Sequence, residues 1–292
     1  MKPQPYGPFS YKTIKDRPKL TWPGGARVAF YVVPNIEYFP LDEKIPGGVN
    51  HIPDVSAWGR RDYGNRVAVF RMIDVMARYD VRGTVALNSN VCDMCPEVVE
   101  ECLNHGWEMM GHCETNSRRL IDVDSDKEAT RIVHDTLERI QKATGKKPKG
   151  WLGAGRQETW NTVNILVEEG CSYTVDWDND DQPVLMDIGG KPLVSMPYGA
   201  GVSDLQAFNR YYYTPDDFER MIKRAFDVLY RESEESGRVV AFSLHPFLIG
   251  LPHRIDALDK GLEYICSHAG VWRATGEEIV NHFLSQQQGT ST

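Results

Sequence analysis

One seven-residue stretch brings together three side chains of the types that act in catalysis or in metal binding. Residues 111–117 read GHCETNS and contain His112, Glu114 and Asn116. An imidazole and a carboxylate in such proximity can serve as general base and general acid, or can bind a divalent cation. A histidine four residues after His112 would complete a metal motif, but that position is Asn116. The stretch therefore has three interpretations: a metal site with an unusual ligand, a site that has lost its metal, or a polar turn.

Other polar side chains directly follow short apolar runs. His245 is the clearest case, because the run VVAFSL leads straight into it, and a polar side chain leaving a hydrophobic strand must be partnered or functional. The other such residues are Asn35 and Glu37 after ARVAFYVVP, Asn88 after RGTVAL, and Trp177 and Asp181 in DWDNDDQP.

The elements that must position these residues alternate along the chain. Strands are expected within 26–33, 82–90, 107–113, 149–153, 171–178, 192–199, 238–247 and 271–275. Helices are expected within 65–80, 96–106, 124–145, 159–170, 214–237, 254–270 and 276–286. Seven or eight strands, each followed by a helix, predict a parallel sheet. At a length of 292 residues, a closed (β/α) barrel is favoured over a doubly wound sheet.

In such a barrel the active site lies at the carboxyl ends of the strands. The candidate residues follow the first, second, third, fifth and a late strand, so the barrel would bring their side chains to one end. A purely structural barrel has little reason to collect carboxylates, amides and imidazoles at one end. The pattern therefore predicts an active site there.

Charge and composition exclude several classes of partner. The net charge is −8, which disfavours nucleic acid and anionic membrane surfaces as partners. No apolar run approaches the roughly 18 residues of a membrane span. The N-terminus has no apolar segment typical of a signal peptide, so a cytoplasmic location is expected. Six cysteines in 292 residues are too few for a disulfide scaffold, and CDMC at 92–95 is interpreted as reduced structural thiols.

The chain shows no internal repeat and no linker, which predicts one domain. We expect that domain to span residues 26–285, after an exposed proline-rich arm at 1–25 and before a loose tail at 286–292.

Several stretches of this chain carry a family resemblance. They are RVAFYVVPNIEYF (27–39), YGNRVAVFRMIDVM (63–76), GWEMMGH (106–112), GWLGAGR (150–156), NDDQP (179–183), MPY (196–198) and HPFLIGLPHR (245–254). Through them the chain resembles the polysaccharide deacetylase (NodB-homology) family from about residue 26 to residue 285. Within that family it is most similar to the branch that contains the metal-independent allantoinase and the bacterial cyclic imidases. The resemblance implies a deformed (β/α) barrel.

The chain departs from the family pattern at the metal site. Family deacetylases carry Asp-x-Asp after the first strand and His-x3-His after the third, and these residues supply a base and the ligands of Zn²⁺ or a similar cation. Here the first motif has Asn35 and Glu37, and the second has His112 and Asn116. An amide oxygen is a poor ligand for Zn²⁺, so a metal-free site without a cofactor is favoured. Zn²⁺ or another divalent cation on Glu37, His112 and Asn116 is the alternative.

The family's usual arginine after the fourth strand is also replaced, by Leu152, and Arg156 is a candidate substitute. Taken together, the residues and the resemblance predict a hydrolase that opens a small cyclic amide, such as an imide, a hydantoin or an allantoin-like ring. In this hypothesis Glu37 or His112 is the general base and His245 is the general acid. The substrate-binding residues would be Asn35, Asn88, Glu114, Asn116, Arg156, Trp177, Asp181 and Arg254, with Asp181 orienting His245 or Arg254.

Two alternatives remain open at this stage. One is a metal-dependent N-deacetylase of peptidoglycan or chitin-type sugars, which predicts an intact metal triad and often secretion. The other is a catalytically degenerate barrel that binds a small ligand. The resemblance further implies a homo-oligomer, a tetramer in this branch, whose partner is a small-molecule substrate.

Overall fold

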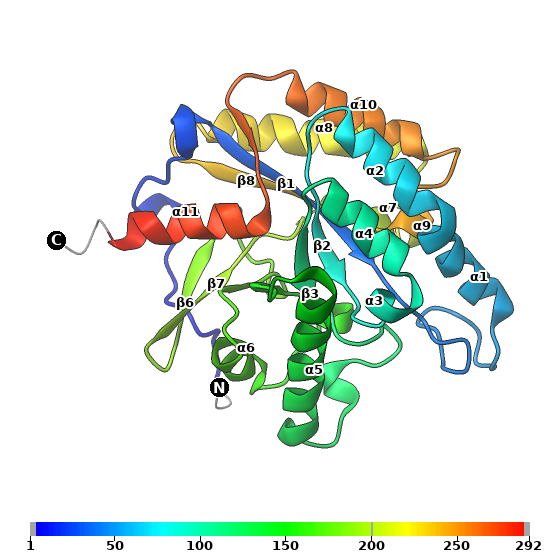
Figure 1. The fold of residues 1–292 in the computed structure, drawn as a ribbon. Coiled ribbons are helices and arrows are strands. Elements are labelled where there is room, and N and C mark those ends of the chain that lie inside the picture. Colours follow the sequence, from blue (N-terminus) through cyan, green and yellow to red (C-terminus); the bar gives the residue numbers. More distant parts are fainter. Residues whose placement is uncertain (1–3, 200, 289–292) are drawn as a thin grey trace.

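The computed structural model describes residues 4–199 and 201–288 and shows one curled sheet wrapped by helices (Figure 1). The strands are β1 (Val28–Ile36), β2 (Thr84–Leu87), β3 (Glu108–Gly111), β4 (Gly150–Trp151), β5 (Tyr173–Thr174), β6 (Val184–Ile188), β7 (Lys191–Ser195), β8 (Arg238–Leu244) and β9 (Val271–Arg273). Their order is β6-β7-β5-β4-β3-β2-β1-β8, and β9 pairs with β1 beside this path. The predicted deformed (β/α) barrel is therefore confirmed, but the expectation of a closed barrel is wrong, because the strand order has two ends, β6 and β8.

One strand departs from the parallel arrangement. Strand β6 pairs antiparallel with β7, because the two strands are joined by only two residues, Gly189 and Gly190. Both glycines have positive φ, of 62° and 83°, as the tight turn of a two-residue hairpin requires. The remaining strand pairs are parallel.

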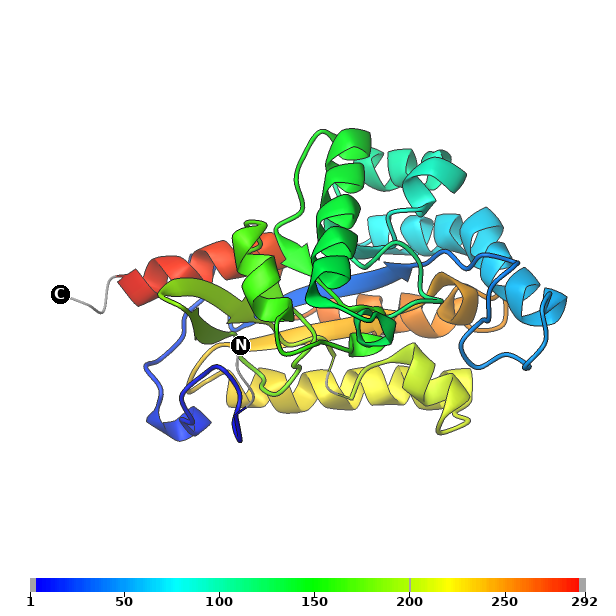
Figure 2. The ribbon, with the colours of Figure 1, turned by 90° about the horizontal axis from the view of Figure 1, so that it is seen from below.

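The helices of the described part of the chain cover the outside of this sheet. Figure 2 shows the long α8 on one side of the sheet and α5 on the other. The helices are α1 (Val55–Tyr63), α2 (Val69–Ala77), α3 (Val91–Met94), α4 (Pro96–Asn104), α5 (Asp126–Thr144), α6 (Thr162–Glu168), α7 (Asp204–Asn209), α8 (Pro215–Glu232), α9 (Pro246–Ile249), α10 (Ile255–Cys266) and α11 (Gly276–Gln288). None of them is long and apolar enough to cross a membrane.

The alternation of side chains along strand β1 determines the direction in which Asn35 and Glu37 point. Its nine residues are all buried, and successive side chains point to opposite faces. Phe30 and Val32 pack in the cluster shared with α2, α8 and α10, whereas Tyr31 and Val33 belong to the inner cluster. Asn35 continues the inner row, and Glu37 follows just beyond the strand end.

The N-terminal arm differs from the prediction of an exposed segment. Leu20 and Trp22 are buried in the inner cluster, and the Trp22 indole donates to the Arg238 carbonyl over 3.0 Å. Farther back, Phe9 packs edge-to-face on Trp177. The expectation of an exposed arm is therefore wrong for these residues, because their apolar side chains complete the packing of the barrel. Of the predicted tail, 286–288 belong to α11, and 289–292 lie outside the described residues.

Candidate active site

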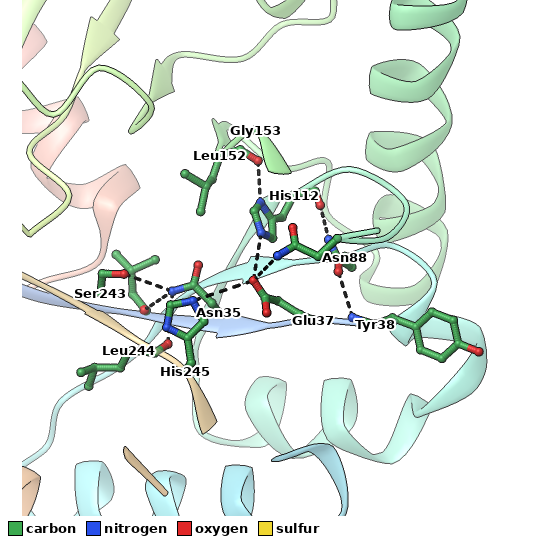
Figure 3. Close-up of polar contacts among 12 residues, drawn as sticks. Asn35, Glu37, Tyr38, Asn88, His112, Leu152, Gly153, Ser243, Leu244 and His245 are labelled. Atoms are coloured by element: carbon green, nitrogen blue, oxygen red, sulfur yellow. Dashed lines mark hydrogen bonds and ion pairs between the residues drawn. The ribbon is translucent and has the colours of Figure 1, made fainter. Parts of the chain in front are cut away.

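The carboxyl ends of β1, β3 and β8 meet, as the barrel prediction requires. Figure 3 shows Glu37, His112 and His245 turned toward one another at this point. They face a cavity of about 150 Å³. Six of the predicted site residues line that cavity: Asn35, Glu37, His112, Asn116, Arg156 and His245.

Glu37 occupies the centre of the group. Its Oε1 atom lies 3.5 Å from Nε2 of His112 and 3.8 Å from Nε2 of His245. The same oxygen accepts a 2.6 Å hydrogen bond from Nδ2 of Asn116. Asn65 fixes the backbone of Glu37 by donating to its carbonyl oxygen. A buried carboxylate between two imidazoles is an arrangement that can take a proton at one side and return it at the other.

One ring nitrogen of His112 is hydrogen-bonded, and the other has no hydrogen-bond partner among the described residues. Its Nδ1 lies 2.7 Å from the carbonyl oxygen of Leu152, and since a carbonyl only accepts, Nδ1 carries the hydrogen. Nε2 is buried and has no hydrogen-bond partner among the described residues. In the neutral ring this nitrogen therefore presents a lone pair next to Glu37.

His245 is held by a residue that the sequence did not reveal. Asp204, the fully buried first residue of α7, accepts from Nδ1 of His245 over 2.8 Å and from its backbone N–H over 2.7 Å. Burial lowers the pKa of His245, but the charges of Asp204 and Glu37 outweigh this effect, and the pKa is raised overall. His245 is therefore suited to donate a proton.

The expectation that Asp181 orients His245 is wrong, since Asp204 has this position. Asp181 does not line the cavity, and its backbone carbonyl instead accepts from the Val239 N–H. Asp204 belongs to GVSDLQ, a stretch without strand periodicity, so the rule of strand ends could not identify it. A serine followed by an aspartate before a helix was the only signal, and such pairs are common helix starts.

Asn35 lines the cavity, but its amide is fully engaged. Its Nδ2 donates to the carbonyls of Val33 and Leu244, over 3.2 and 3.1 Å. Its Oδ1 accepts a 2.7 Å hydrogen bond from the hydroxyl of Tyr198, a second residue that the sequence analysis did not select. The amide thus ties the end of β1 to the end of β8 and leaves no free donor for a substrate.

Asn88 and Glu114 do not line the cavity, contrary to the prediction. Asn88 accepts from the backbone N–H of Tyr38 over 2.8 Å and donates to the backbone carbonyl of His112. It therefore supports the backbone of His112 rather than binding a substrate. Glu114 points outward and lies 3.4 Å from Arg131.

Arg156 reaches the cavity, as the sequence suggested for a replacement of the family arginine. Its guanidinium donates to the carbonyl of Asp176 over 3.1 Å and lies 3.3 Å from the carboxylate of Asp178. The side chain remains 35% exposed, so part of the group is available for a ligand. Its backbone φ of 57° is rare for a residue with a side chain, and such strain is often found at functional sites.

Trp177 and Arg254 also lie outside the cavity lining. Trp177 contacts Phe9, with 5.6 Å between ring centroids, and Arg254 stacks on the ring of Phe208 at 4.1 Å. Both side chains are used in packing, and this geometry gives no support to their assignment to substrate binding.

The donors at the suspected metal position do not fit Zn²⁺ well. Glu37 and His112 could each supply one ligand atom, but Asn116 turns its amide nitrogen, which has no lone pair to give, toward Glu37. The described residues contain no group of three or more His, Cys, Asp or Glu side chains arranged to hold a metal ion. We therefore derive no reaction step through a metal.

Comparison with known proteins places this geometry in context. Residues 61–174 match the sequence model of the polysaccharide deacetylase family. A candidate polysaccharide deacetylase of Schizosaccharomyces pombe is 30% identical over 237 residues, which cover 75% of this chain and 73% of that protein. A peptidoglycan deacetylase of Helicobacter pylori is 22% identical over 272 residues, 82% of this chain and 90% of that protein. The crystal structure of PuuE allantoinase superimposes with a TM-score of 0.84 at 25% identity, over 97% of this chain and 98% of that one. These matches confirm the resemblance inferred from the sequence.

Proposed function

Since the chain belongs to the polysaccharide deacetylase family, we propose that it is a hydrolase of carbon–nitrogen bonds whose substrate is a small cyclic amide. The observation that carries this proposal is the buried Glu37 between His112 and His245 at a cavity of about 150 Å³. A void of that size accepts a single small ring. An imide, hydantoin or allantoin-like ring fits this limit, and PuuE allantoinase is the relative that supports it.

The reaction begins with a water molecule between Glu37 and His112. Glu37 takes a proton from this water while the water oxygen attacks the ring carbonyl carbon. Nε2 of His112 accepts a hydrogen bond from the second water hydrogen and so orients the water oxygen. The carbon–nitrogen bond then breaks, and His245 gives its proton to the departing ring nitrogen. Glu37 Oε1 lies 3.8 Å from Nε2 of His245, so the proton taken from water can return to His245 over a short path. The product is an open chain with a carboxyl group at one end.

A cyclic imide or ureide is a suitable substrate for such a site. The nitrogen that leaves is conjugated to a second carbonyl, so it departs more easily than the nitrogen of a simple acetamide, and the reaction depends less on a Lewis acid. Oδ1 of Asn116 is buried without a hydrogen-bond partner among the described residues, so it can accept the ring N–H. Arg156 can donate to the oxyanion that forms in the transition state.

The alternative is a metal-dependent N-deacetylase of peptidoglycan or chitin-type sugars, which the two deacetylase relatives support. It requires a carboxylate base where Asn35 stands and a third metal ligand where Asn116 stands. A ligand-binding barrel without turnover is a further candidate. The retention of Glu37, His112 and His245 around one cavity supports catalysis over that reading.

One assay set separates these functions. Protein stripped of metal by a chelator is tested against allantoin, succinimide, hydantoin and N-acetylglucosamine oligomers, with its metal content measured alongside. We expect ring opening of at least one cyclic amide by the stripped protein, and its loss in Glu37→Gln. Activity that appears only on the oligomers and only after Zn²⁺ is added would establish the deacetylase instead. Binding without turnover across the panel would establish the binding barrel.

A further inference from the structure

A single peptide unit connects His112 to a buried acid outside the cavity. The carbonyl of Leu152 accepts from Nδ1 of His112 over 2.7 Å. The N–H of the same peptide unit, which belongs to Gly153, donates to Oδ1 of Asp176 over 2.8 Å. A continuous chain of two hydrogen bonds thus runs from the Asp176 carboxylate, through one peptide group, to the imidazole.

These two hydrogen bonds transmit the effect of the Asp176 charge to the ring of His112. A charged acceptor on the N–H side polarises the peptide group, and this makes the carbonyl on the other side a stronger acceptor. The stronger acceptor holds the hydrogen of His112 on Nδ1 and fixes the plane of the ring. Partners of this kind behind a functional histidine set its tautomer and orientation.

The position of Asp176 is fixed by burial and by a second hydrogen bond. It is 7% exposed, and its second oxygen lies 3.2 Å from the hydroxyl of Thr174. Gly153 permits the close approach, because a Cβ atom at that position would lie 2.8 Å from the carbonyl oxygen of Gln157 and 3.3 Å from Oδ2 of Asp176.

A neighbouring acid allows Asp176 to carry the negative charge. Burial, followed by the charge of Asp176, raises the pKa of Glu158 well above its usual value. Burial raises the pKa of Asp176 as well, but the hydrogen bonds from Glu158 and from the Gly153 N–H oppose this effect. The proton of the pair therefore lies on Glu158, and the acceptor of the Gly153 N–H is a carboxylate.

We propose that Asp176 is a positioning residue, which fixes the tautomer and the plane of His112 through the Leu152–Gly153 peptide unit. The effect on turnover rests on the proposed function of His112, whereas the effect on the tautomer does not. The side chain of Asp176 does not line the cavity and acts through His112.

Three variants test the proposal. Asp176→Asn keeps an acceptor for the Gly153 N–H without its charge, and Asp176→Ala removes both. Glu158→Gln is the matched control, since it changes a buried carboxyl of the same group that does not bond the peptide unit. With the cyclic amide that the wild-type protein opens, we expect kcat to fall about 10- to 100-fold in Asp176→Ala and less in Asp176→Asn, while KM changes less than about twofold. In Glu158→Gln both constants should stay within about twofold of the wild type.

The tautomer of His112 is the second readout and needs no substrate. Nitrogen-15 spectra of the imidazole rings, with His112 assigned by its absence in His112→Gln, should show the hydrogen on Nδ1 in the wild type. In Asp176→Ala they should show a mixture of tautomers, and in Asp176→Asn the Nδ1 form should largely be retained. A folded Asp176→Ala protein with the wild-type tautomer and the wild-type kcat overturns the proposal. If Asp176→Ala fails to fold, kcat of Asp176→Asn decides, and a wild-type kcat in that variant overturns the proposal. A wild-type protein that opens no amide would refute the proposed function and leave the tautomer test intact.

Discussion

The hydroxyl of Tyr198 donates to Oδ1 of Asn35 over 2.7 Å, and this bond determines which end of the amide faces β8. Nδ2 consequently faces the carbonyl of Leu244, the residue before His245. Asn35 itself stands two residues before Glu37. One amide therefore ties the strand of the proposed base to the strand of the proposed acid.

The first prediction concerns Asn35→Asp, the change that restores the residue type of the deacetylase pattern. The new carboxylate oxygen would face the carbonyls of Val33 and Leu244, where Nδ2 now donates. We expect the variant to lose about 1–3 kcal/mol of unfolding free energy and most of its ring-opening activity. We also expect no gain of Zn²⁺-dependent deacetylation of N-acetylglucosamine oligomers. Denaturant unfolding and both assays check this, and Zn²⁺-dependent deacetylation by the variant would contradict it.

The second prediction concerns the proposed base. Glu37→Gln keeps the shape of the side chain but cannot take a proton from water, so kcat should fall at least ~100-fold. Glu114→Gln is the matched control, because Glu114 is close in sequence to the site yet points away and pairs with Arg131. Its kcat and KM should stay within about twofold of the wild type. Steady-state kinetics distinguish the two variants, and near-full activity of Glu37→Gln would remove Glu37 from the mechanism.

The third prediction concerns pH. Asp204 and Glu37 raise the pKa of His245 against the opposing effects of burial and Arg61. A general acid works while protonated, so activity should be present below this raised pKa and should decline as the pH rises through it. In Asp204→Asn the main raising charge is gone and burial dominates, so the alkaline limb of the kcat/KM profile should move to lower pH. An unchanged profile in that variant would show that Asp204 does not tune His245.

The general acid can also be tested by removal. His245→Ala should lower kcat at least ~100-fold, because the departing ring nitrogen loses its proton donor. The loss should be smaller for a substrate whose leaving nitrogen is more acidic, since such a nitrogen departs with less help. Rates for two imides of different acidity measure this, and equal losses for both would place His245 outside the proton transfer.

The fifth prediction concerns substrate binding by arginine. Arg156 lines the cavity, whereas Arg254 stacks on Phe208 outside it. Arg156→Met should therefore lower kcat/KM by about tenfold or more through the loss of a charged donor. The same change at Arg254 should leave kcat/KM within about threefold. A larger loss in the Arg254 variant would reverse the assignment.

The proposed catalytic residues could be found from the sequence because barrel geometry relates sequence position to location. Glu37, His112 and His245 each follow an apolar run, and parallel strands bring their carboxyl ends together. Asn88 follows such a run equally well, yet both ends of its amide bond to backbone groups. Whether an amide at a strand end can bind a substrate or is already hydrogen-bonded to the backbone depends on chain segments that are distant in sequence. A local sequence pattern does not contain this information.

The supporting acids were missed for the same reason. Asp204 begins a six-residue helix, and Asp176 acts on His112 through a peptide unit 23 residues earlier in the chain. Their roles arise from one or two contacts that form only in the folded chain. The antiparallel β6 could have been predicted from the sequence, since two adjacent glycines between the stretches VLMDI and KPLVS favour a tight hairpin.

The docking of the N-terminal arm has a consequence for solubility. Strand β6 ends the order of the sheet, so one side of it offers unpaired N–H and C=O groups to any other extended chain. The carbonyl of Pro8 in the arm accepts from the N–H of Asp187 on this strand over 3.3 Å. The arm thus occupies part of the edge with backbone of the same molecule, and its proline cannot continue a ladder of hydrogen bonds outward. The arm, which the sequence predicted to be exposed, therefore helps to protect the sheet against edge-to-edge aggregation.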